Sequence, residues 1–272
     1  MWLVPSFEDT RKAVLRDSPA SYRLLLRGAR LADSRVADIV VADGMITSVS
    51  SDPTGDPSHA EVVDLSGYLL RPSLVEPHAH LSLPSADWMK GRRMDRGSWA
   101  AARSGPAVTD VATRIWAGAA RYLMNGTTAI RVHVDVGQKA GMRAVEALLD
   151  ARSSLAGIFD IQIVAAISAP VTGLAGATNR ALLRHALAAG ADLVGAGPGL
   201  VNETGRTVES LAVVAADAGS GLDVHVDETA GSVLSALPRL IAITRADFGH
   251  PVTVSHVAGL GTKVNQRRRA TR

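Results

Sequence analysis

From residue 69 onward, short apolar segments alternate with alanine-rich stretches of helical length, and this alternation constrains the fold more than any other feature. Strands that alternate with helices in this way are typical of a parallel sheet whose helices cover its outer face. The pattern predicts an α/β fold, namely an incomplete (β/α)8 TIM-type barrel of about six βα units. The predicted strands are residues 69–81, 127–136, 160–167, 191–199, 222–228 and 251–257.

A different pattern precedes the barrel. Residues 22–68 contain segments rich in β-branched residues, separated by Asp-Gly and proline-containing turns, and they predict a short antiparallel sheet. We interpret it as a small N-terminal β-sandwich portion. The expected organisation is a leader without assignment at 1–21, the β-sandwich portion at 22–68, the barrel at 69–260 and a basic tail at 261–272.

Two helix ends are marked by single residues. Gly190 follows an alanine- and leucine-rich stretch, and glycine in that place is typical of the C-terminal end of a helix. Thr207 precedes another helical stretch, and its hydroxyl predicts an N-cap.

The composition narrows the classes of protein. With 47% apolar residues in 272, the chain can bury one large core, and a disordered chain is not expected. No run of about 18 apolar residues occurs, and the start carries acids and proline too early for a signal peptide, so we expect a cytoplasmic protein without a membrane partner. The absence of cysteine leaves only histidine and carboxylates to bind a metal.

The formal net charge of +3 comes from the tail. The tail holds five of the 29 basic residues. The rest of the chain therefore has 24 basic and 26 acidic residues, a net charge of −2. A basic end of this kind is more often solvated than bound to phosphates, so we expect no nucleic-acid partner. The five are Lys263, Arg267, Arg268, Arg269 and Arg272.

Histidines gather at the ends of the predicted strands. His78 and His80 are two residues apart in one strand and therefore point to the same side. His225 and His256 lie near the ends of the fifth and sixth strands, where barrel enzymes carry their active sites. Because imidazole nitrogens bind divalent ions, the pattern predicts a shared metal site.

Three further residues lie at strand ends. His133 ends the second strand, and we interpret it as a strand-end residue or a hydrogen-bonding neighbour of the site. Glu228 follows His225 by three residues, where its carboxylate can relay a proton from a metal-activated water to a leaving amine. Asp227 has two interpretations of equal weight, namely a catalytic residue or a strand-end residue that hydrogen-bonds the next loop.

Five short motifs occur in the order of a known family. They are Val-Glu-Pro-His-Ala-His-Leu, Arg-Val-His-Val-Asp, Asp-Ile-Gln-Ile-Val-Ala, Asp-Val-His-Val-Asp-Glu and Val-Ser-His, and together they resemble the cytosine deaminase branch of the amidohydrolase superfamily over roughly residues 24–260. The resemblance implies that His78, His80 and His225 bind one divalent metal ion, Fe2+ or Zn2+. It also implies that Glu228 is the proton shuttle, His256 a metal-site or water-orienting histidine, and Gln162 a partner for the amide edge of a pyrimidine.

The resemblance implies hydrolysis of a C–N bond other than a peptide bond, in the first place deamination of cytosine or a related small heterocycle. A dihydropyrimidinase-like cyclic-amide hydrolase and an inactive remnant are the alternatives. Binuclear cyclic amidases usually carry a bridging lysine near the end of the fourth strand, and residues 191–199 contain none, which favours the deaminase.

The chain also departs from the family pattern. The family takes its last metal ligand, an aspartate, from an eighth strand, whereas no acidic residue follows Asp247. We expect from this a C-terminally truncated or frame-shifted chain that lacks strands seven and eight. Its first and sixth strands would then be unpaired edges. Such edges favour association between copies of the chain, so a homo-oligomer is one expected state.

Overall fold

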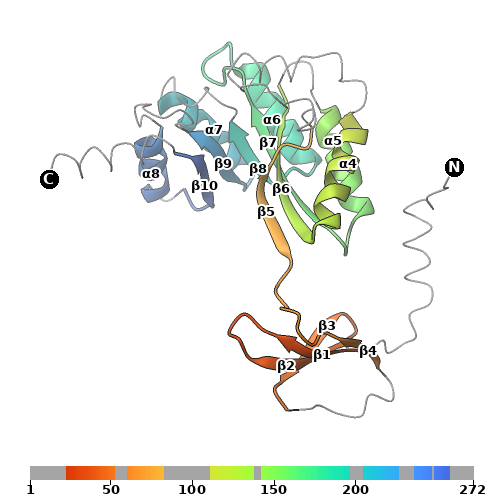
Figure 1. Cartoon of the computed structure of the whole chain (residues 1–272). Coiled ribbons are helices and arrows are strands. Elements are labelled where there is room, and N and C mark those ends of the chain that lie inside the picture. The colour runs from red at the N-terminus through yellow and green to blue at the C-terminus, as the bar shows by residue number, and fades with distance from the viewer. Residues whose placement is uncertain are drawn as a thin grey trace, which may run out of the picture. The chain divides into compact units, whose positions relative to one another are not determined.

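The computed structural model describes residues 23–52, 60–82, 111–137, 142–196, 205–226, 236–246 and 248–257. The chain forms two compact units, Met1–Pro72 and Ser73–Arg272 (Figure 1). The leader at 1–21 and the basic tail at 261–272 lie outside the described residues, so both assignments stay predictions.

The first unit is a four-stranded sheet in the order β3-β2-β1-β4. Asp43 and Gly44 both have positive φ and form the tight turn between β2 and β3, as an Asp-Gly hairpin requires. The prediction of an antiparallel sheet is wrong for one pair, because β4 runs parallel to β1. The strands are β1 (Arg23–Arg30), β2 (Val36–Ala42), β3 (Met45–Ser50) and β4 (Glu61–Asp64).

The second unit contains a parallel sheet whose six described strands are neighbours in chain order. Every residue of β8 and β9 is buried, as expected for strands that are covered on both faces. Each strand overlaps a predicted segment, and β7 has the predicted bounds. The strands are β5 (Leu74–Ala79), β6 (Thr127–Asp135), β7 (Asp160–Ile167), β8 (Leu193–Ala196), β9 (Gly221–Val226) and β10 (Val252–His256).

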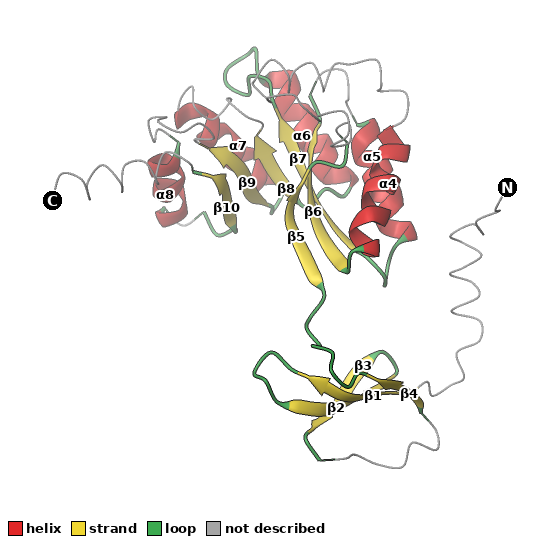
Figure 2. Ribbon diagram, in the orientation of Figure 1, coloured by secondary structure: helices red, strands yellow, loops and turns green. Residues whose placement is uncertain are grey.

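Helices cover the outer face of this sheet (Figure 2). Gly190 ends α6 in the left-handed conformation, with φ of 117°, as predicted. The prediction for Thr207 is wrong, because α7 begins two residues earlier and Thr207 is buried inside it. Among the described residues, none of the helices has the length and apolar character to cross a bilayer. The helices are α4 (Val111–Met124), α5 (Arg143–Ser154), α6 (Ala177–Ala189), α7 (Gly205–Asp217) and α8 (Leu237–Arg245).

The sheet is strongly curled. The hydroxyl oxygen of Ser255 in β10 lies 3.0 Å from Nδ1 of His78 in β5, although these strands are the two edges of the sheet. In a flat sheet, five spacings of about 4.8 Å would separate the edges by roughly 24 Å. The curl therefore turns the inner face into a concave surface on which side chains from distant strands meet.

Close packing inside the curl makes one glycine sensitive to substitution. A Cβ at Gly195 would lie 2.7 Å from Cγ1 of Val164 and 2.8 Å from the backbone oxygen of Asp223. Because the backbone of β9 cannot shift without disturbing the sheet, Gly195→Ala should lower the free energy of unfolding by about 1–3 kcal/mol in chemical denaturation. In the control Gly205→Ala, the nearest described atom to the added Cβ is in the flexible Arg239 side chain, at 3.4 Å. Stability should then change by less than about 0.5 kcal/mol. Equal losses in both variants would contradict this packing.

Candidate metal centre

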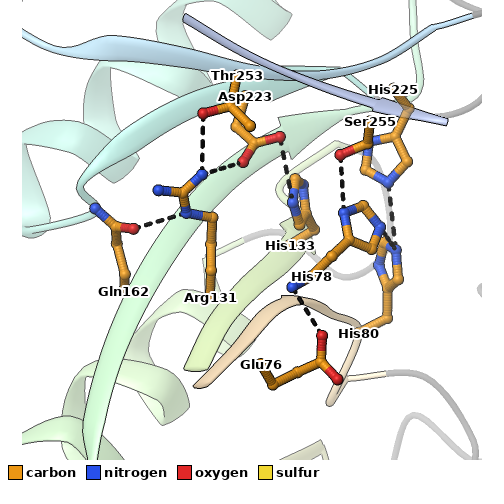
Figure 3. A network of polar contacts seen from close by, with 10 residues as sticks. All are labelled: Glu76, His78, His80, Arg131, His133, Gln162, Asp223, His225, Thr253 and Ser255. Atoms are coloured by element: carbon orange, nitrogen blue, oxygen red, sulfur yellow. Dashed lines mark hydrogen bonds and ion pairs between the residues drawn. The ribbon is translucent and has the colours of Figure 1, made fainter. Parts of the chain in front are cut away.

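Four imidazoles converge at the C-terminal ends of three strands (Figure 3). His78 lies in β5 and His80 directly follows it, and both point to the concave face because they are two residues apart. His133 in β6 and His225 in β9 approach from across the curl. The ring centroid of His78 is 4.4 Å from that of His133 and 4.6 Å from that of His225.

The separations between ring nitrogens suit a shared cation. Nε2 of His80 is 3.2 Å from Nε2 of His78 and 3.4 Å from Nε2 of His225. Two nitrogens bound to one tetrahedral ion at about 2.0–2.1 Å are about 3.3–3.4 Å apart. A single proton on His80 could serve only one of these two contacts. A divalent ion bound through Nε2 of His80 and a neighbouring ring nitrogen would relieve this conflict, so the chemistry of these donors suits a divalent ion.

His133 belongs to the same cluster. The three histidines whose ligand atoms all lie within 4.8 Å of one another are His78, His133 and His225, so this group contains His133 in place of the predicted ligand His80. The His133 side chain is 1% exposed, and neither of its ring nitrogens has a hydrogen-bond partner among the described residues. Sequence reasoning places His133 beside the ligands, and only its position at a strand end indicated a role in the site.

Burial favours the neutral form of three of these imidazoles. Desolvation, followed by the nearby His80, lowers the pKa of His225 to about 3. Burial is also the main cause that lowers the pKa of His133 and of His78. At neutral pH the rings therefore present lone pairs, the form in which imidazole binds a divalent ion.

Two neighbours hold His78 in place. Its backbone N–H donates to Oε1 of Glu76 at 3.0 Å. Its Nδ1 is paired with the Ser255 hydroxyl, so a proton on Nδ1 would leave Nε2 free for a cation. Neither Glu76 nor Ser255 was predicted from the sequence. Ser255 reaches His78 only through the approach of β10 to β5, whereas the Glu76 contact is local to β5.

His256 lies at the rim of the cluster. It is exposed at the end of β10, and its ring centroid is 5.2 Å from that of His225 and 5.5 Å from that of His78. His256 has φ of 73° and Val257 has φ of 49°. Positive φ is costly for such residues, above all for a β-branched one, and strain of this kind concentrates at functional sites.

The structure does not test the assignments of the other two predicted site residues. Glu228, with Asp227, lies outside the described residues, and its assignment as proton shuttle stays a prediction. Gln162 is the third residue of β7 and is exposed, and its side-chain oxygen accepts a hydrogen bond from Nε of Arg131 at 2.7 Å. The structure does not bring Gln162 into the histidine cluster (Figure 3), so its contact with a pyrimidine also stays a prediction.

Comparisons with known proteins give relatives over much of the chain. No family model matches it. N-isopropylammelide isopropyl amidohydrolase from Pseudomonas sp. (strain ADP) is 28% identical over 189 residues, which cover 64% of this chain and 45% of that protein. The chain thus spans about half the length of this curated relative.

Two solved structures extend the similarity. N-isopropylammelide isopropylaminohydrolase from Burkholderia multivorans ATCC 17616 has a TM-score of 0.70 and 29% identity, over 86% of this chain and 60% of its own. The 5-methylcytosine deaminase from Klebsiella pneumoniae, liganded with phosphonocytosine, has a TM-score of 0.72 and 26% identity, over 88% and 60%. These matches confirm the predicted α/β fold class of the TIM-barrel type.

Removing one ligand should disrupt metal binding. We expect the purified 272-residue chain to bind about one equivalent of Zn2+. His80→Ala should lose at least about tenfold in affinity, because Nε2 of His80 lies close to Nε2 of both other predicted ligands. Equilibrium dialysis followed by elemental analysis measures both quantities. His185→Ala, at an exposed position of α6, is the control and should bind as the wild type does. Unchanged binding by His80→Ala would contradict the site.

The neutral imidazoles also predict how stability depends on pH. Because the pKa of His225 is about 3 in the folded chain and about 6.5 when unfolded, the unfolded state binds more protons between these values. The contribution of His225 is therefore complete above about pH 6.5 and is lost as the pH falls. The free energy of unfolding of the metal-free chain, measured with urea, should fall by roughly 1 kcal/mol between pH 7 and pH 5.5 because of His225 alone.

The variant His225→Asn should flatten this pH dependence, whereas His185→Asn should keep it. If His225→Asn keeps the wild-type slope, His225 is not held neutral by burial.

Proposed function

Because this chain belongs to the amidohydrolase superfamily, we propose that it catalyses metal-dependent hydrolysis of a C–N bond other than a peptide bond, releasing an amine from cytosine or a related nitrogen heterocycle. The convergence of Nε2 of His80 with Nε2 of His78 and of His225 is the observation that carries the proposal. The fold supports it, since parallel barrels place their active sites at the C-terminal ends of the strands.

The proposed ligands of one divalent ion, Fe2+ or Zn2+, are His78, His80 and His225. Imidazole suits both metals. The chemistry that such an ion supplies when bound is activation of water near neutral pH. The chain's own contribution is to present neutral rings at fixed separations, which burial and the Ser255 contact to His78 both favour.

Two residues are proposed to handle protons. Glu228 follows the last residue of β9, Val226, by two positions, and we assign its carboxylate to take a proton from the attacking water and pass it to the leaving amine. His256, at the rim of the cluster, is assigned to orient that water or the substrate. Both roles rest on the resemblance together with the position of the histidine cluster.

The relatives support an amine as the leaving group. Two of them are named a 5-methylcytosine deaminase and an N-isopropylammelide isopropylaminohydrolase, which points to an amino and an alkylamino leaving group. A cyclic-amide hydrolase with two metal ions is less well supported, since the described β8 consists of Leu193, Val194, Gly195 and Ala196 and offers no lysine to bridge a second ion.

Turnover by the metal-loaded chain tests the proposal. We expect release of ammonia from cytosine or 5-methylcytosine, or of isopropylamine from N-isopropylammelide, with kcat lowered at least about 100-fold in Glu228→Gln. Elemental analysis should show unchanged metal content in that variant, because Glu228 is assigned to proton transfer and not to binding the ion. Glu146→Gln, at an exposed position of α5, is the matched control and should keep wild-type turnover.

A metal-loaded wild type that is inactive on all three compounds would contradict the proposed substrates. Full activity in Glu228→Gln would remove Glu228 from the mechanism.

A further inference from the structure

An ion pair lies next to the histidine cluster, deeper along the same strands. Nη1 of Arg131 in β6 is 2.6 Å from Oδ2 of Asp223 in β9, whose side chain is 1% exposed. Arg131 precedes His133 by two residues, and Asp223 precedes His225 by two. All four side chains therefore point to the concave face.

The guanidinium of Arg131 is held from several sides. Its Nε donates to Oε1 of Gln162 in β7 at 2.7 Å, and its Nη1 also donates to the hydroxyl of Thr253 in β10 at 3.1 Å. Arg131 thus ties β6 to β7, β9 and β10 (Figure 3). A guanidinium with three partners has little freedom, so Oδ2 of Asp223 has a fixed position.

The other oxygen of Asp223 faces the cluster. Oδ1 is buried and has no hydrogen-bond partner among the described residues, and it lies 3.6 Å from Nε2 of His133. Burying a carboxylate costs free energy unless both oxygens gain partners that replace the lost water. Arg131 donates to Oδ2 and leaves Oδ1 without such a partner among the described residues. A neutral imidazole carries one ring proton, and a carboxylate opposite Nε2 favours the proton there. The lone pair is then left on Nδ1.

We propose that Arg131 and Asp223 are positioning residues of the metal centre: Arg131 fixes Asp223, and Asp223 fixes the orientation and the tautomer of His133 among the ligands. His133 transmits the effect because its ring centroid is 4.4 Å from that of His78 and 4.6 Å from that of His225. The effect on metal affinity rests on the proposed function, whereas the effect on the tautomer of His133 does not.

A second ion pair in the same unit provides a control for a purely structural role. Nη1 of Arg152 is 2.9 Å from Oδ2 of Asp192, which also accepts the backbone N–H of Ile163 at 2.7 Å. Through Asp192 this pair links α5 to β7, and the polar contacts of the two side chains among the described residues do not reach a histidine. Asp192→Asn therefore removes an ion pair of the sheet without touching the cluster.

The direct test is the tautomer of His133 in the metal-free full chain, read from long-range 1H–15N spectra of 15N-histidine-labelled protein and assigned with His133→Gln. We expect the Nε2–H form in the wild type. In Asp223→Asn the amide oxygen should face Arg131 and the NH2 group should face His133, which converts His133 to the Nδ1–H form. Asp192→Asn should keep the wild-type tautomer. An Nδ1–H form in the wild type, or an unchanged tautomer in Asp223→Asn, would overturn the inference.

The second readout is affinity for Co2+, followed through its visible absorption spectrum. Loss of a partner outside the ligands typically lowers metal affinity about 10- to 100-fold, and we expect this for Asp223→Asn. Arg131→Lys keeps the charge but not the fork of donors, so its affinity should lie between those of Asp223→Asn and the wild type. Arg131→Lys also replaces Asp223→Asn as the test variant in both experiments if Asp223→Asn does not fold. Asp192→Asn should bind Co2+ as the wild type does.

Unchanged Co2+ affinity and spectrum in Asp223→Asn would overturn the positioning role. A wild-type chain that binds no Co2+ would instead contradict the proposed function, and the tautomer comparison would then decide the link between Asp223 and His133 by itself.

Discussion

The candidate site depends on the curl of the parallel sheet. Only because the edge strands β5 and β10 approach each other can His78 meet Ser255 at 3.0 Å and His80 meet His225 at 3.4 Å. Burial inside the curl also lowers the pKa of His78 and of His225, which favours their neutral form and leaves their lone pairs available. Geometry and protonation state therefore have one common cause, and both favour a bound cation.

Much of the fold could be predicted because its signals are local. The length and composition of each strand are written in its own residues, so β7 has the predicted bounds and the other strands of the barrel overlap their predicted segments. Gly190 ended α6 as expected, since a left-handed residue at a helix end is a local requirement. The approach of His78, His80 and His225 followed from alternation along strands and from the rule that barrel sites lie at strand ends.

Contacts set by register between strands could not be predicted in this way. The parallel pairing of β4 with β1 depends on where the chain returns to the sheet, and no local pattern encodes it. The same holds for Arg131, which lies opposite Gln162 in the register of β6 and β7 and takes the amide oxygen that the sequence had assigned to a substrate. The approach of Nε2 of His133 to Oδ1 of Asp223 likewise depends on β6 and β9 facing each other across the curl, which no local pattern predicts.

We propose that His78, His80 and His225 bind one divalent ion. Anomalous diffraction from crystals of the Zn2+-loaded chain, recorded on both sides of the zinc absorption edge, tests it most directly. We expect one strong peak about 2.0–2.1 Å from Nε2 of each of the three rings. A peak elsewhere, or three rings that turn away from one another around no peak, would contradict it.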